Sequence, residues 1–234
     1  MHCLHFLQGH NIPQAIACGC VPWRVERMVQ AQLAQFSSVR ERTLNMVQRL
    51  SQEQMDFSPA AGEWSVGEVV DHLLLAEEMY RTEITTLVEL MKTGQTPRIY
   101  RSFTDLNAGP AIIPKAILPF FEVPFTLLTM FTPSSIRECV ARSQLVPIWH
   151  PDNTTPRQSR AVDKLRHELG ASLTETKALF AAHPNLDYAR MIYQHPLLGV
   201  QNIPQLLDFM GLHEELHQQQ ISNALAHPRF PRAA

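Results

Sequence analysis

The sequence predicts an all-α fold, a four-helix bundle with one long insertion. Four long stretches carry apolar residues at intervals of three and four, which is the period of an amphipathic α-helix. Three of these stretches begin with a capping residue followed three positions later by Glu or Gln, and strand-like alternation is almost absent. Helices that each bury a single apolar stripe are expected to pack together as a bundle.

The first helix is expected to begin its periodic pattern near Met28 and to end near Ser51. Residues 23–58 contain no Gly or Pro, and apolar side chains recur at helical spacing as far as Leu50. Gln, Arg and Glu fill the positions between them, as expected for a helix with one solvated face.

The second helix has the clearest start signal in the chain. Ser65 is the predicted N-cap, and Glu68 stands three residues later, which completes a capping box. Trp64 and Val69 flank the cap as a predicted hydrophobic staple. The helix is expected to end at residues 93–94.

A proline-rich insertion, residues 95–154, separates the second and third helices. It contains eight prolines, and its segment 112–131 is strongly apolar. The length of this segment suits a membrane span, but Lys115, Glu122 and three prolines within it argue against stable membrane insertion. Short helices and irregular chain, packed over the bundle or over a partner subunit, are therefore expected, and they could wall a pocket.

The remaining two helices are predicted from their caps. Thr155 is the predicted N-cap of the third helix, with Pro156 at the first helical position, and residues 183–184 end it. The fourth helix is expected to start at Asn202, with Gln205 three residues later.

Three segments are expected along the chain. Residues 1–24 show no clear periodicity and are expected to form a loose, disordered extension. Residues 25–226 are expected to form the bundle domain, including the insertion, and residues 227–234 a short tail. The first ten residues have neither the basic region nor the long apolar core of a signal peptide, so the cytoplasm is the expected compartment.

Composition and cysteine usage exclude several classes. With 45% hydrophobic and 18% charged residues, the chain resembles an ordinary soluble globular protein. A formal net charge of -2 argues against nucleic-acid binding, which requires a basic face. The cysteines form no C-x-x-C pair, so neither a disulfide framework nor a zinc ribbon is expected; they are Cys3, Cys18, Cys20 and Cys139.

Three histidines lie on the apolar stripes of the predicted helices. His213 and His217 stand four residues apart on the last helix, a spacing that separates Cβ atoms by about 5–6 Å. His72 lies on the stripe of the second helix. Neutral imidazole is a strong ligand, and three imidazoles leave a coordination position for water or substrate. The pattern therefore predicts one divalent metal ion; the alternative is three core histidines with hydrogen-bonded partners.

Residues 213–217 also match H-E-x-x-H, the zinc metalloprotease signature. Such enzymes need a third ligand downstream, and the chain has no Asp or Glu after His217. A protease is therefore disfavoured. Glu214 and Glu215 are then expected to be solvated helix charges; a hydrogen bond to a metal ligand, or a role as a base, is the alternative. For Glu68 the capping box is favoured over a hydrogen bond that fixes the tautomer of His72.

Two motifs resemble the DinB-like (damage-inducible) superfamily. Residues 63–73, EWSVGEVVDHL, resemble the start of the second helix in that superfamily. Residues 195–199, HPLLG, followed by residues 212–221, LHEELHQQQI, resemble its C-terminal signature. The order and spacing of the motifs also agree, so the resemblance spans about residues 28–225.

The resemblance implies a four-helix bundle in up-down-down-up order, with a long link where residues 95–154 fall. It implies a metal-binding triad of His72, His213 and His217, holding zinc or nickel, with iron or manganese as further candidates. Members are often homodimers, and characterised relatives are thiol S-transferases or thiol-dependent isomerases that use low-molecular-weight thiols. His195 belongs to the second motif; it is expected to pack near the turn before the last helix, with a substrate contact as the alternative.

The expected function is therefore that of a metal-dependent small-molecule enzyme, a thiol S-transferase or a hydrolase. One alternative is a non-catalytic bundle that binds a metal or a small ligand. Another is a structural bundle that dimerises through segment 112–131. The long apolar insertion and the N-terminal extension depart from the family pattern, so a pocket different from that of typical members is expected.

Overall fold

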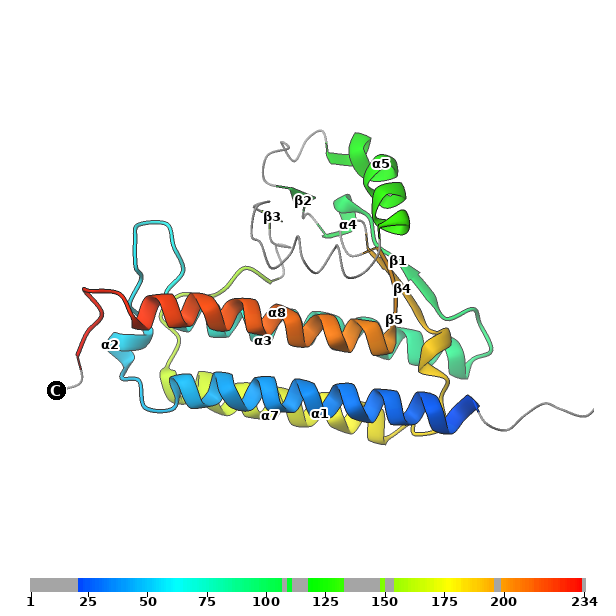
Figure 1. Cartoon of the computed structure of the whole chain (residues 1–234), viewed down its shortest axis with the longest axis horizontal. Helices are drawn as coiled ribbons and strands as arrows, with labels where there is room; N and C mark the ends of the chain where they lie inside the picture. Colours follow the sequence, from blue (N-terminus) through cyan, green and yellow to red (C-terminus); the bar gives the residue numbers. More distant parts are fainter. Residues whose placement is uncertain are drawn as a thin grey trace, which may run out of the picture.

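Four long helices pack side by side and form the body of the protein (Figure 1). The computed structural model describes residues 21–106, 109–110, 118–132, 148–149, 154–195 and 199–232. The long helices are α1 (Val21–Val47), α3 (Val66–Lys92), α7 (Val162–Ala181) and α8 (Ile203–Leu225). Helices α1 and α8 run in one direction and α3 and α7 in the other, and α3 and α1 each contact both α7 and α8.

The predicted caps of two long helices are confirmed. Ser65 accepts a hydrogen bond from the backbone N–H of Glu68, whose carboxylate accepts one from the backbone N–H of Ser65. Asn202 and Gln205 form the same reciprocal pair at the start of α8. These caps satisfy backbone donors that the first helical turn leaves without partners.

Helix α1 differs from its predicted bounds at both ends. It begins at Val21, before the periodic pattern, and it ends at Val47. Ser51 does not end the first helix but caps a separate short one, α2 (Gln52–Met55), again with a capping box. Residues 1–20 of the predicted extension lie outside the described residues, as do all four cysteines.

The predicted start of the third helix is wrong. Helix α7 begins at Val162, and its N-cap residue Ala161 makes no side-chain capping bond. Thr155 and Pro156 belong instead to an irregular linker that runs along α3. Asp71 of α3 binds this linker, as described below, and this tertiary contact outweighs the local helix-start signal.

A small three-stranded sheet, which the sequence pattern did not predict, lies beside the end of the helices where α8 begins (Figure 1). Strand β1 (Arg98–Tyr100) pairs in parallel with β4 (Ile192–His195), which pairs antiparallel with β5 (Gly199–Asn202). Strands of three and four residues are too short to show a clear period of two. The fold is therefore mostly helical, with a minor β component.

The insertion contributes several short elements. They are β1, α4 (Phe103–Leu106), α5 (Leu118–Phe131) and the pair of β2 (Gly109–Pro110) with β3 (Ile148–Trp149). After α7, a 3-10 turn, η3 (Tyr188–Arg190), leads into β4. Helix α5 contacts α4 and β5 and exposes apolar side chains, among them Phe120 at 81% and Leu128 at 62%. Among the described residues, no helix combines the length and the apolar character needed to cross a bilayer.

A buried ionic network lies at the centre of the four long helices. The Arg40 side chain on α1 is 1% exposed and donates to Glu77 of α3 and Glu214 of α8, each at 2.8 Å. It also donates to the backbone carbonyl of Leu169 on α7 at 2.7 Å. One guanidinium therefore contacts all three other long helices.

Two hydroxyl groups complete this network. Thr43 of α1 donates to Glu214, and Thr176 of α7 donates to Glu77. The expectation that Glu214 is a solvated charge is wrong, because α1 supplies a buried partner that the periodicity of α8 alone cannot reveal. Glu215 fits the expectation better, since it is partly exposed and pairs with the exposed Arg42.

His195 occupies the end of β4 and is buried, with its ring 6.1 Å from that of Tyr193. Burial lowers the pKa of His195 to about 3. The folded protein therefore holds this imidazole neutral, whereas the unfolded chain protonates it near its ordinary pKa of about 6.5. Residues 196–198 of the adjoining motif lie outside the described residues.

Replacing Arg40 with Leu is expected to lower the free energy of unfolding by about 3–5 kcal/mol, because two carboxylates remain buried without their cation. Urea unfolding followed by circular dichroism measures this. Arg42→Leu is the control, since it removes an exposed pair and is expected to cost under about 1 kcal/mol. Equal losses in the two variants would contradict the role of the buried network.

His195 is expected to destabilise the protein as the pH falls below about 6.5, because the unfolded state then binds a proton that the folded state does not. Between pH 7 and pH 5 this loss amounts to about 2 kcal/mol. The His195→Leu variant should lack that component. Urea midpoints at the two pH values measure it, and parallel losses in both proteins would count against a buried neutral imidazole.

Candidate metal centre

The structure brings the three predicted histidines together. His72 of α3 faces His213 and His217 of α8, and the ligand atoms of the three rings all lie within 4.8 Å of one another. The Nε2 atom of His213 lies 3.3 Å from that of His72 and 3.1 Å from that of His217. The convergence expected from sequence spacing is therefore observed. His72 and His217 are buried, and His213 is partly exposed.

Outer hydrogen bonds fix two of the three rings. The Nδ1 atom of His72 lies 2.7 Å from the backbone carbonyl oxygen of Thr154. The Nδ1 atom of His217 lies 2.7 Å from Oε1 of Gln220. A carbonyl oxygen only accepts, so Nδ1 carries a proton in both rings, and in the neutral form of each ring Nε2 has a lone pair. Both lone pairs are available at the centre of the cluster.

These donors fit a divalent ion. Two nitrogens bound to a tetrahedral zinc at 2.0–2.1 Å are separated by about 3.3 Å, which is close to the spacings of 3.3 Å and 3.1 Å from His213 to the other two rings. Without a cation or a proton between them, lone pairs on neighbouring rings would repel at this distance. Three neutral imidazoles suit zinc, nickel, iron or copper and leave coordination positions open.

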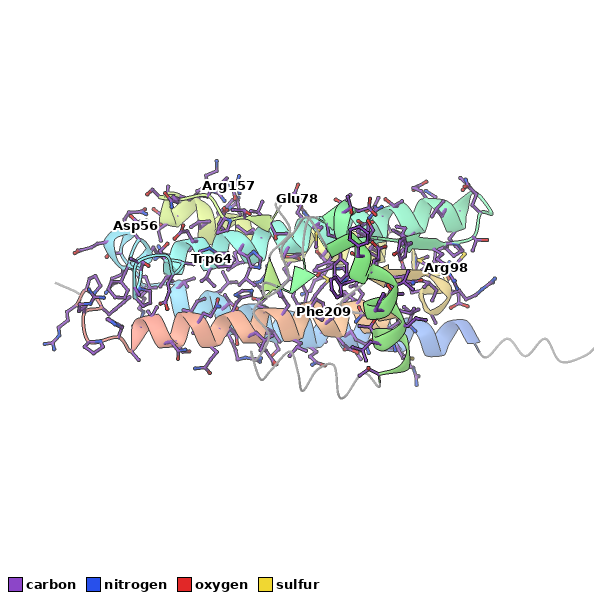
Figure 2. The ribbon with its side chains drawn as sticks, turned by 90° about the horizontal axis from the view of Figure 1, so that it is seen from above. Asp56, Trp64, Glu78, Arg98, Arg157 and Phe209 are labelled. Carbon is purple, nitrogen blue, oxygen red and sulfur yellow. The ribbon has the colours of Figure 1, made fainter. Side chains whose placement is uncertain are left out.

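Aromatic side chains surround the rings. Trp64 lies between α3 and α8 in Figure 2, and its ring centroid is 4.8 Å from that of His72 and 6.2 Å from that of His217. Phe209, which is labelled nearer the start of α8, stacks on His213 with 6.0 Å between the ring centroids. These contacts restrict rotation of the rings. Trp64 was predicted only as a staple, and nothing in its local pattern shows this second role.

The linker that supplies the Thr154 carbonyl is bound to α3 by Asp71. This carboxylate is fully buried and accepts hydrogen bonds from the backbone N–H and guanidinium of Arg157 and from Arg160. Burial would raise the pKa of Asp71, but these hydrogen bonds outweigh it and hold the pKa below its ordinary value. Asp71 directly precedes His72. The same turn of α3 therefore carries the His72 ring and binds the linker whose Thr154 carbonyl orients that ring.

The other predicted site residues lie elsewhere. Glu68 is used in the capping box, where Oε2 lies 2.8 Å from the backbone nitrogen of Ser65. Glu214 binds Arg40 in the bundle core, so the glutamate of the H-E-x-x-H pattern does not follow the protease arrangement. His195 on β4 is not a member of the three-histidine cluster. The sequence reasoning missed Thr154, which contributes through its backbone and leaves no residue-type signal.

The chain is similar to a protein from Bacillus subtilis (strain 168), the uncharacterized protein YuaE. The two are 25% identical over 186 residues, which cover 80% of this chain and 92% of the relative. No solved structure gives a significant match. The family model of the DinB superfamily matches residues 35–221, a span that includes all three clustered histidines and most of the 234 residues. The chain therefore belongs to the DinB superfamily.

Proposed function

We propose that this DinB superfamily protein holds one divalent metal ion through His72, His213 and His217 and acts as a metal-dependent enzyme on a small molecule. The reaction types we propose are thiol S-transfer or hydrolysis. The observation that supports the proposal most is the convergence of three ring nitrogens, two of them with a defined tautomer. The metal-binding character of the superfamily supports it independently. We also propose that the four long helices form the up-down-down-up bundle of the family.

When bound, the metal would act as a Lewis acid that favours the deprotonated form of a coordinated thiol or water. The residues of the chain would perform the remaining tasks. The three imidazoles bind as neutral ligands and leave a position for substrate. Thr154 and Gln220 hold two of the rings in orientation, and Trp64 packs against His72.

Among the described residues, two carboxylates that stand close to the ligands in sequence are engaged elsewhere and are not available as a general base. Glu68 accepts a hydrogen bond within its capping box, and Glu214 is directed into the core towards Arg40. This arrangement supports a reaction in which the coordinated group is itself the nucleophile, as a thiolate would be. We propose zinc or nickel as the metal, because imidazole nitrogen is a good ligand for both.

We further propose a cytoplasmic homodimer. Support comes from α5, whose exposed apolar side chains form a patch on one short helix: Phe120, Phe121, Val123, Leu127 and Leu128. Exposed patches of several large apolar side chains commonly mark protein–protein contacts. No described contact covers these side chains fully, since each remains at least 38% exposed.

Replacing His213 with Ala is expected to lower the metal content of protein purified without a histidine tag from about one ion per chain to near zero, because one of three ligands is lost. Elemental analysis measures this. His167→Ala is the matched control, since His167 is an exposed histidine on α7, and it should retain the metal. Full metal content in the His213→Ala protein would refute the ligand assignment.

The same proteins separate catalysis from metal binding alone. Conjugation of a low-molecular-weight thiol to an electrophile, followed by loss of free thiol, should occur with the wild type and the His167→Ala control. It should be absent from the His213→Ala protein and from chelator-treated wild type, and zinc or nickel should restore it in the latter. Metal binding without turnover of thiols or hydrolysable esters would favour the non-catalytic alternative.

Replacing Phe120 with Asp is expected to shift the protein from dimer to monomer, because the largest exposed side chain of the patch becomes charged. Size-exclusion chromatography with light scattering measures the mass at matched concentrations. Phe120→Leu keeps the patch apolar and should leave the mass unchanged. A monomeric wild type, or a dimer that persists in the Phe120→Asp protein, would argue against α5 as the interface.

A further inference from the structure

Gln220 lies one helical turn beyond His217 on α8 and binds the ring nitrogen that faces away from the cluster. Its Oε1 atom is 2.7 Å from Nδ1 of His217. Metal-bound histidines commonly donate this N–H to a carboxylate, a backbone carbonyl or water. Here the acceptor is the side-chain amide of a glutamine. A glutamine side chain has nearly the same shape as that of a glutamate but carries no charge.

The acceptor on His72 is uncharged as well, because it is the backbone carbonyl of Thr154. Two acidic residues that directly follow or precede a ligand in sequence are bound elsewhere. Asp71 accepts from two arginines, and Glu214 accepts from Arg40 and Thr43. The two described outer contacts, from His72 to Thr154 and from His217 to Gln220, therefore add no negative charge.

The charge of an outer acceptor affects the whole centre. A carboxylate draws the imidazole proton towards itself, makes the other nitrogen more basic and partly neutralises a bound cation. A neutral amide orients the ring equally well but leaves more of the positive charge in place. A centre of neutral ligands with neutral acceptors attracts an anion to its open position more strongly than one with carboxylate acceptors.

We propose that Gln220 is a positioning residue that fixes His217 without adding charge, and that this favours capture of a small anion, such as a thiolate, at the open position. The inference rests on the proposed metal site and extends it, because it assigns a residue to the selection of an anionic ligand. It explains why an amide can serve here: a glutamate of the same length would orient the ring but weaken anion binding.

The test compares three variants loaded with Co²⁺, with azide as the anionic probe. Gln220→Glu adds a charge at the acceptor, Gln220→Leu removes the acceptor, and Gln219→Glu is the matched control. Gln219 is the preceding residue of α8, is exposed and bonds to Asn223, so its replacement adds the same charge away from His217. Competition with a chromophoric chelator gives the Kd for Co²⁺, and the visible Co²⁺ spectrum gives the Kd for azide.

The Gln220→Glu protein is expected to bind Co²⁺ about 10-fold more tightly and azide about 10-fold more weakly than the wild type. The Gln220→Leu protein should lose about 10-fold to 100-fold in Co²⁺ affinity. The Gln219→Glu control should match the wild type in both measurements. Unchanged azide affinity in Gln220→Glu, or an equal change in the control, would overturn the inference.

The outcomes also separate this inference from the proposed function. A wild-type chain that binds no Co²⁺, Zn²⁺ or Ni²⁺ overturns both. A wild type that binds metal, and whose three variants bind metal and azide as it does, overturns only the role of Gln220. Since Gln220 is exposed on the surface of α8, its replacement should leave the fold intact, which the far-ultraviolet spectrum of each variant verifies.

Discussion

The structure depends on one buried cation. Arg40 is almost fully removed from water, and a guanidinium in that position requires charged and polar partners that are correctly oriented. These partners lie on α3, α7 and α8. The Arg40 guanidinium therefore constrains the rotation of each of these helices about its own axis. Apolar packing alone would tolerate several rotations of such helices, since many apolar side chains of similar size can replace one another.

That constraint extends to the histidine cluster. Glu214 and His213 are consecutive on α8, and successive helical residues point about 100° apart. Once Glu214 is bound to Arg40 in the core, His213 must point towards the α3 side. On α3, His72 stands five residues before Glu77, which places the two side chains about 140° apart around that helix. The ionic network and the histidine cluster therefore share two helices, and the network sets the helix rotations at which the rings can meet.

Much of the fold and part of the site could be predicted from sequence, for reasons that differ between residues. The caps at Ser65 and Asn202 are local, because the residues that interact are three positions apart and their types are diagnostic. The histidine cluster could be predicted because polar rings on apolar stripes require an explanation. The burial of Glu214 could not, because its partner stands 174 residues away. The predicted start of α7 was wrong for the same reason, because a contact with α3, distant in sequence, keeps the residues before Val162 out of the helix.

The contact between His72 and Thr154 joins the end of the insertion to the centre of the site. Because a main-chain oxygen makes this contact, the orientation of the ring does not depend on which side chain stands at position 154. The anchor, Asp71, belongs to the helix and not to the insertion. The side chain at this end of the insertion can therefore change while the backbone of its last residue continues to hold the ring. In a fold of this kind, the surroundings of the histidine cluster can change through one connecting segment while the cluster itself keeps its orientation.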